Sequence, residues 1–116
     1  MLSTSNRLTA SKDIMKVLRT GQRTGAGPFV VYALRNQSGA IDMTRMTVVI
    51  SKKVDKRAVV RNRCRRRVRE AFRPLLPHLE PGFDILIYIK QDMGTVPFET
   101  VTSDVTQGCR KLGLLK

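Results

Sequence analysis

Seven arginines crowd into the thirteen residues from Arg61 to Arg73, where the chain reads RNRCRRRVREAFR, and only one acid, Glu70, lies among them. The guanidinium group is planar, stays charged at physiological pH and donates paired hydrogen bonds that match the oxygens of a phosphate. Like charges at this density repel one another along a helix, and a polyanion relieves that repulsion. The first chemistry that the sequence indicates is therefore the binding of a nucleic acid backbone.

Basic charge is concentrated rather than spread over the chain. The 116 residues carry a formal net charge of +13, and the stretch from Lys52 to Arg73 contributes net +9, with eleven lysines and arginines against two acids. The remaining residues hold eleven bases and seven acids, which is an ordinary balance. A hydrophobic content of 41% is sufficient for a folded core. We expect a single domain, residues 1–116, with one strongly basic element.

Groups that catalyse reactions are scarce. His78 is the only histidine and lies in a proline-flanked loop, and the nine carboxylates are scattered, without a pair typical of a two-metal nuclease. Cys64 and Cys109 have no metal-binding spacing and are expected to be small core residues. We expect no catalytic residue and no metal site in the protein itself. Because no apolar run approaches the about 18 residues that cross a bilayer and no secretory signal is visible, a cytoplasmic location is expected.

The elements that position the arginines start with a short helix. It is expected to begin at Ser11 and to end before Gly21, with an apolar stripe formed by Ile14, Val17 and Leu18. Gly21 to Pro28 is typical of a loop, and Phe29 to Arg35 of a β-strand. After a turn over Asn36 to Asp42, a second strand is expected over Arg45 to Ser51, paired antiparallel with the first.

The arginine-rich segment then forms a helix that ends at Pro74. Its apolar face, at 100° per residue, is expected to comprise Val60, Cys64, Val68, Ala71 and Phe72. Phe83 to Ile89 reads as a central strand buried on both faces, and a last helix runs from Pro97 to about Leu112. The order α-β-β-α-β-α predicts an α+β fold, a two-layer α/β sandwich.

Other interpretations of the arginine-rich helix fit the sequence less well. A solvated charged face normally alternates its signs, and a membrane-surface helix needs large apolar anchors on its other face. A nuclear-localisation segment is not expected inside a folded β-α-β unit. A helix that binds RNA or DNA is the best interpretation of composition and periodicity.

A longer string separates RNA from DNA. SKKVDKRAVVRNRCRRRVREAFR, from Ser51 to Arg73, resembles the signature of the protein subunit of bacterial ribonuclease P. That signature has a Lys-Lys pair closing a strand, a short loop and an Arg-Asn-Arg motif opening a basic helix. The resemblance extends through NRL at Asn6 to Leu8, SKDIMKVLRTG, FVVYAL and FDILIYIK, and so covers nearly the whole chain in order.

The resemblance implies a function and a fold detail. Family members bind a catalytic RNA, which uses Mg²⁺ to remove the 5′ leader from precursor tRNA, and the protein helps to bind that leader. No cofactor is expected to be held tightly by the protein, and neither DNA nor a membrane is expected as a partner. The family fold, ribosomal S5 domain 2-like, has a left-handed β-α-β crossover, against the general right-handed preference.

The resemblance also assigns residues to two sites. Contacts with the RNA subunit are expected from Lys52, Lys53, Arg57, Arg61, Asn62, Arg63, Arg65, Arg66, Arg69 and Arg73. Contacts with the leader are expected from Ile14, Leu18, Phe29, Tyr32 and Lys90.

Three positions of the chain differ from the pattern of the family. Ile14 and Leu18 stand where phenylalanine is common and cannot stack on bases, so Phe29 and Tyr32 are the aromatic residues expected near the leader. Arg67 stands where an apolar residue is usual; its stem is expected to pack while its head reaches out.

The sequence is also compatible with two rival functions. One is a structural RNA-binding protein, such as a ribosomal protein, which would leave tRNA processing unchanged. The other is a DNA-binding module, which is weakened by the lack of a helix-turn-helix partner for the basic helix.

Overall fold

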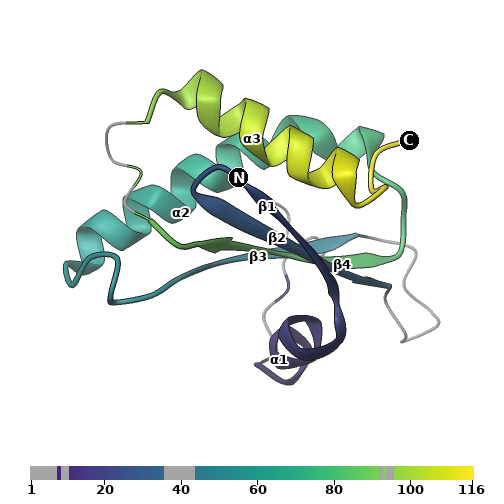
Figure 1. Cartoon of the computed structure of the whole chain (residues 1–116), viewed down its shortest axis with the longest axis horizontal. Coiled ribbons are helices and arrows are strands. Elements are labelled where there is room, and N and C mark those ends of the chain that lie inside the picture. The colour runs from purple at the N-terminus through teal and green to yellow at the C-terminus, as the bar shows by residue number, and fades with distance from the viewer. Residues whose placement is uncertain (1–7, 9–10, 36–43, 92, 94–95) are drawn as a thin grey trace.

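The computed structural model describes residues 8, 11–35, 44–91, 93 and 96–116, which form an α+β sandwich with helices on both faces of one sheet (Figure 1). The helices are α1 (Ser11–Thr20), α2 (Ala58–Phe72) and α3 (Phe98–Lys111), and a 3-10 helix, η2 (Arg73–His78), follows α2. The strands are β1 (Gln22–Ala26), β2 (Phe29–Arg35), β3 (Arg45–Ile50) and β4 (Phe83–Ile89). The turn predicted over Asn36 to Asp42 lies outside the described residues.

The sheet has the strand order β1-β2-β4-β3. β2 pairs antiparallel with β1 and β4, and β3 pairs parallel with β4. The predicted antiparallel pairing of the two strands Phe29 to Arg35 and Arg45 to Ser51 is therefore wrong. β4 lies between β2 and β3. Its almost continuously apolar sequence suits this central position, where both of its faces and both of its edges are covered.

The loop predicted over Gly21 to Pro28 is also wrong, because most of it forms strand β1. Ala26 pairs with Phe29, so Gly27 and Pro28 form a two-residue hairpin turn. Gly27 has φ +59°, a conformation that glycine adopts without strain and that suits such turns. The glycines and proline that suggested an irregular loop thus close a hairpin.

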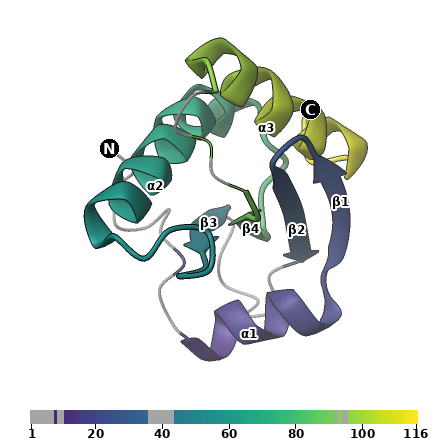
Figure 2. The same cartoon turned by 60° about the vertical axis from the view of Figure 1, so that its left-hand side comes forward.

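Two apolar clusters lie on opposite faces of the sheet. α2 and α3 cover one face, and α1 covers part of the other (Figure 2). The larger cluster includes Phe29, Val31 and Ile87, while the smaller one, under α1, centres on Val17 and Leu86. The crossover from β3 through α2 to β4 joins adjacent parallel strands, and its left hand stays a prediction from the family resemblance.

Candidate RNA-binding surfaces

Helix α2 divides its side chains as the sequence predicts. Cys64, Val68, Ala71 and Phe72 are buried in the larger cluster, with Val60 packed at its edge. The exposed residues predicted to bind RNA are Asn62, Arg63, Arg66 and Arg69 on this helix and Arg73 directly after it. The apolar face fixes the helix on the sheet, so it presents a row of cationic side chains on a rigid support.

Arg61, predicted to bind RNA, is half-buried and braces the β3–α2 loop from inside. Its Nη1 donates hydrogen bonds to the carbonyl oxygens of Asp55, at 3.0 Å, and Lys56, at 2.7 Å. One turn further along, Arg65 donates to Oδ1 of Asn62 at 2.6 Å. Arg61 therefore shapes the surface by ordering the loop, whereas the exposed arginines form its outer face.

The β3–α2 loop is ordered by its own polar contacts. Asp55 accepts hydrogen bonds from the backbone N–H of Arg57 at 2.8 Å and from its guanidinium at 3.1 and 2.9 Å. These hydrogen bonds lower the pKa of Asp55 to about 2. The backbone N–H of Lys53 donates to Oγ of Ser51 at 2.9 Å, so the basic pair at 52–53 starts from a defined turn.

Arg67 differs from its neighbours because its head points into the molecule. Its guanidinium donates to the carbonyl oxygen of Met93 at 2.6 Å and to that of Val96. The prediction that the head reaches out is wrong: carbonyl groups between β4 and α3 supply the acceptors that a half-buried guanidinium needs. Arg67 thus holds two segments together and does not belong to the exposed basic row.

The predicted leader-binding residues lie on the face of the sheet that α1 covers. Ile14 and Leu18 of α1 and Tyr32 of β2 are half-buried around the smaller cluster. Lys90 is exposed just beyond β4, and its backbone N–H donates to the carbonyl oxygen of Pro28 at 3.0 Å. The structure brings Ile14, Leu18 and Tyr32 into one cluster.

Phe29 does not belong to that face, and its predicted contact with the leader is wrong. Its side chain is fully buried in the larger cluster, on the side of α2 and α3. Successive strand residues point to opposite faces, so Phe29 and Tyr32, three positions apart, point away from each other. The alternation of side chains along β2 was therefore sufficient to predict that Phe29 and Tyr32 lie on opposite faces of the sheet.

Helix α1 is tied to the sheet by Arg45. Its guanidinium donates to Asp84 at 2.9 and 2.8 Å, and its Nη2 lies 3.5 Å from Oδ2 of Asp13, in the first turn of α1. The hydrogen bonds to Asp84 are the main cause that raises the pKa of Arg45 above its usual value. This contact fixes one end of the helix that carries Ile14 and Leu18.

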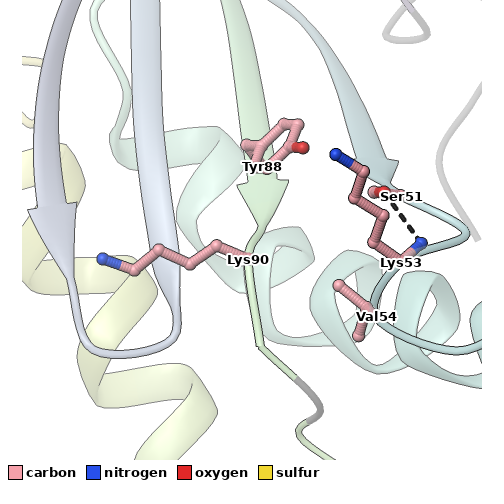
Figure 3. A pocket seen from close by; sticks show the side chains of 5 residues that line it. All are labelled: Ser51, Lys53, Val54, Tyr88 and Lys90. Atoms are coloured by element: carbon pink, nitrogen blue, oxygen red, sulfur yellow. Dashed lines mark hydrogen bonds between the residues drawn. The ribbon is translucent and has the colours of Figure 1, made fainter.

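Tyr88 also lies on this face and was not among the residues predicted from the sequence. It is half-buried at the edge of the cluster under α1 and also lines a cavity of about 190 Å³. The cavity is lined by Ser51, Lys53, Val54, Tyr88 and Lys90 (Figure 3). Side chains along a strand alternate between its two faces, so Tyr88, two residues after Leu86, was predictable as a residue of the same face.

Within the described ranges, no group of three or more His, Cys, Asp and Glu residues is placed to hold a metal ion. Burial raises the pKa of the Cys109 thiol to about 12, so this cysteine is not a nucleophile at neutral pH. None of the described helices is long and apolar enough to cross a membrane. What these residues do supply is a basic helix and a partly open sheet face, which suit the binding of RNA.

Comparison with known proteins shows that most of the chain is similar to one protein family. The family model for ribonuclease P matches residues 2–113. The ribonuclease P protein component of Ruegeria pomeroyi is 38% identical over 107 residues, which cover 90% of this chain and 84% of that protein. That of Clavibacter michiganensis is 36% identical, with 90% of each chain covered.

Solved structures agree with the fold. The ribonuclease P protein of Thermotoga maritima superposes with a TM-score of 0.75 at 28% identity, covering 87% of this chain and 92% of that one. That of Staphylococcus aureus, at 23% identity, superposes with a TM-score of 0.82 and covers 96% and 98%.

Proposed function

The chain belongs to the family of bacterial ribonuclease P proteins, and we propose that it gives separate surfaces to two RNAs. Ribonuclease P removes the 5′ leader of precursor tRNA, and this chain is its accessory protein component. One proposed surface binds the catalytic RNA, and the other binds the leader. Both proposed partners are made and matured in the bacterial cytoplasm, which supports a cytoplasmic location for the protein.

The exposed face of α2, with the adjoining loop, is the proposed surface for the catalytic RNA. Arg63, Arg66 and Arg69 are exposed on a helix whose other side is buried, and Arg73 is exposed directly after it. The backbone that carries these side chains is therefore already ordered before RNA binds. Lys52, Lys53 and Arg57 extend this surface into the loop that Arg61 braces. Guanidinium groups in a fixed row favour bidentate contacts with successive phosphates.

The sheet face beside α1 is the proposed surface for the leader. The leader is single-stranded, and such RNA binds where aromatic rings and cations adjoin. Tyr32 offers a ring there, Ile14 and Leu18 form an aliphatic wall, and Lys90 supplies positive charge at one end. Mature tRNA lacks a leader, so this surface distinguishes precursor from product.

We assign the hydrolysis itself to the RNA, with Mg²⁺ held mainly by that RNA. The groups that this chain presents on the two surfaces are guanidinium, ammonium and phenol side chains, which bind and orient polyanions rather than activate water at neutral pH. The protein's part is to raise affinity for the precursor and to neutralise charge where the two RNAs meet.

The observation that carries the proposal is the arginine row of α2 on a rigid, apolar-backed helix. The test mixes this chain with a bacterial ribonuclease P RNA at low Mg²⁺, where the RNA alone cleaves poorly, and follows cleavage of precursor tRNA. Restored and accurate removal of the leader is expected. Binding without restored cleavage, together with tighter binding of ribosomal RNA, would favour a purely structural RNA-binding protein instead.

A further inference from the structure

Tyr88 lies at the border between the covered and the open part of the sheet face. On one side it packs against the cluster of Leu86 and Val17 under α1. On the other side its neighbours across the strands are Val30, and beyond that Gly25, neither of which belongs to that cluster. A Cβ atom added at Gly25 would meet nothing within 4 Å, so this end of the face is open.

Tyr88 and Tyr32 are diagonal neighbours on adjacent antiparallel strands. Tyr32 is paired with Leu86, and Tyr88 is two positions further along β4. Such diagonal positions lie roughly 7–8 Å apart, within reach of aromatic side chains. Two rings on one face, at this separation, suit neighbouring nucleotides of an extended strand.

The cavity next to Tyr88 combines an apolar wall with positive charge. Its volume is about 190 Å³, and Val54 and the Tyr88 ring supply apolar surface. Figure 3 shows Lys53 extending toward the hydroxyl of Tyr88, while Lys90 points away from it, so the Lys53 ammonium is the one beside the ring. In the part of the chain that the structure describes, neither ammonium group forms a salt bridge.

We infer that this cavity takes one unpaired nucleotide of the leader, with its base against Tyr88 and its phosphate beside Lys53. The inference rests on the proposed function and adds a second stacking position beside Tyr32. A lone inorganic anion would need the ammonium group but not the ring, and the paired bases of a duplex would not reach the ring at all. Lys53 then contributes to the leader surface as well as to the surface for the catalytic RNA.

The test is a double-mutant cycle between the protein and the leader, using the assembled complex with ribonuclease P RNA. Precursor tRNAs carry a single abasic nucleotide at successive leader positions, and their affinities are measured with the unaltered protein and with Tyr88→Leu. Stacking of one base predicts that Tyr88→Leu weakens binding roughly fivefold or more. At the one leader position whose base stacks on Tyr88, the abasic change should cause no further loss of affinity in Tyr88→Leu. At every other position, the fold-losses in affinity from the abasic change and from Tyr88→Leu should multiply.

Losses that multiply at every leader position would overturn the inference. Tyr88→Phe keeps the ring and should bind like the unaltered protein, and Phe98→Ala, which removes an exposed ring at the start of α3, is the matched control. Unchanged affinity of Tyr88→Leu for the RNA subunit shows that the variant is folded.

A measurement on the unaltered protein guards against a folding defect. A fluorescent base at the position found in the scan should be quenched when the precursor binds, and an unquenched base there would also contradict the stacking. If the unaltered complex binds precursor and mature tRNA equally, the proposed function itself fails. If precursor is preferred but no position couples to Tyr88, only the cavity assignment fails.

Discussion

Arg45 and Asp84, on neighbouring parallel strands, form a two-point contact in which Nε donates to Oδ1 at 2.9 Å and Nη2 to Oδ2 at 2.8 Å. The side chain of Asp84 is only 8% exposed, and that of Arg45 is 19% exposed. The same guanidinium reaches Asp13 in α1 at 3.5 Å. One arginine therefore joins β3, β4 and the helix that forms a wall of the proposed leader surface.

Removal of Arg45 should lower the stability of the protein strongly. Arg45→Met leaves a buried carboxylate without its guanidinium partner, which predicts a loss of about 3 kcal/mol in the free energy of unfolding. Urea denaturation monitored by circular dichroism measures it. Arg23→Met, at an exposed position in β1, serves as the control and should change stability by less than about 0.5 kcal/mol. Equal effects of the two substitutions would show that the Arg45–Asp84 contact contributes little.

Arg66 and Arg67 are adjacent in sequence and should behave oppositely. Arg66 is exposed, so Arg66→Ala should weaken binding to the catalytic RNA and reduce the salt dependence of log K by roughly 0.7–0.9 for each phosphate that the side chain neutralises. Arg67 is bound to the carbonyl oxygens of Met93 and Val96, so Arg67→Met should reduce stability and leave the salt slope unchanged. Binding titrations between about 50 and 200 mM salt decide this. A reduced slope only for Arg67→Met would reverse the assignment.

Tyr32→Ala should weaken binding of precursor tRNA and not of mature tRNA. The ring is half-buried on the sheet face that α1 partly covers, and loss of one stacked base costs roughly 1–3 kcal/mol. Equilibrium binding of both tRNAs to the assembled complex measures the difference. Tyr32→Phe, which keeps the ring, should retain the preference for precursor. A similar loss for both tRNAs would remove Tyr32 from the leader surface.

Asp55 should make the stability of the β3–α2 loop depend on acid pH. Its folded pKa, about 2, lies below the ordinary value of 3.8, because Arg57 donates hydrogen bonds to the carboxylate. A lowered pKa stabilises the fold above about pH 4, and this contribution is lost as pH falls through 2. The difference in free energy of unfolding between the unaltered protein and Asp55→Asn should therefore shrink between pH 5 and pH 2. A difference that stays constant over this range would contradict the assignment.

Gly108 and Gly25 offer a matched pair of glycine substitutions. A Cβ atom at Gly108 would lie 2.6 Å from Cγ2 of Val31, where α3 crosses β2, so Gly108→Ala should destabilise the protein by about 1–3 kcal/mol. Gly25→Ala meets open space and should be neutral or slightly stabilising. Thermal unfolding of both variants checks this. Similar melting temperatures would mean that α3 moves away from β2 without cost.

Local patterns in the sequence predicted the elements that depend on local forces. The apolar stripe of α2, the end of that helix before Pro74 and the buried character of β4 follow from side-chain periodicity and from backbone restrictions of single residues. The exposed arginine row follows from the same stripe, because residues opposite the apolar face of a packed helix point outward. These predictions are confirmed.

Predictions from the sequence were wrong where the outcome depended on contacts between distant segments. β3 pairs with β4 rather than with β2, and Arg67 turns inward because Met93 and Val96 happen to lie beside it. Phe29 was assigned to the wrong face although the strand's period of two was visible, because the assignment followed aromatic type instead of position.

The sequence by itself determined that this protein is a small basic domain of the ribonuclease P family, since charge and motif are properties of the chain. Only the tertiary structure placed Lys53, Tyr88 and Lys90 around one cavity, since they come from a loop and from the end of a strand. Strand pairing and loop closure set such distances. Strand pairing and loop closure depend in turn on the burial of whole faces of the sheet, which no short stretch of sequence specifies alone.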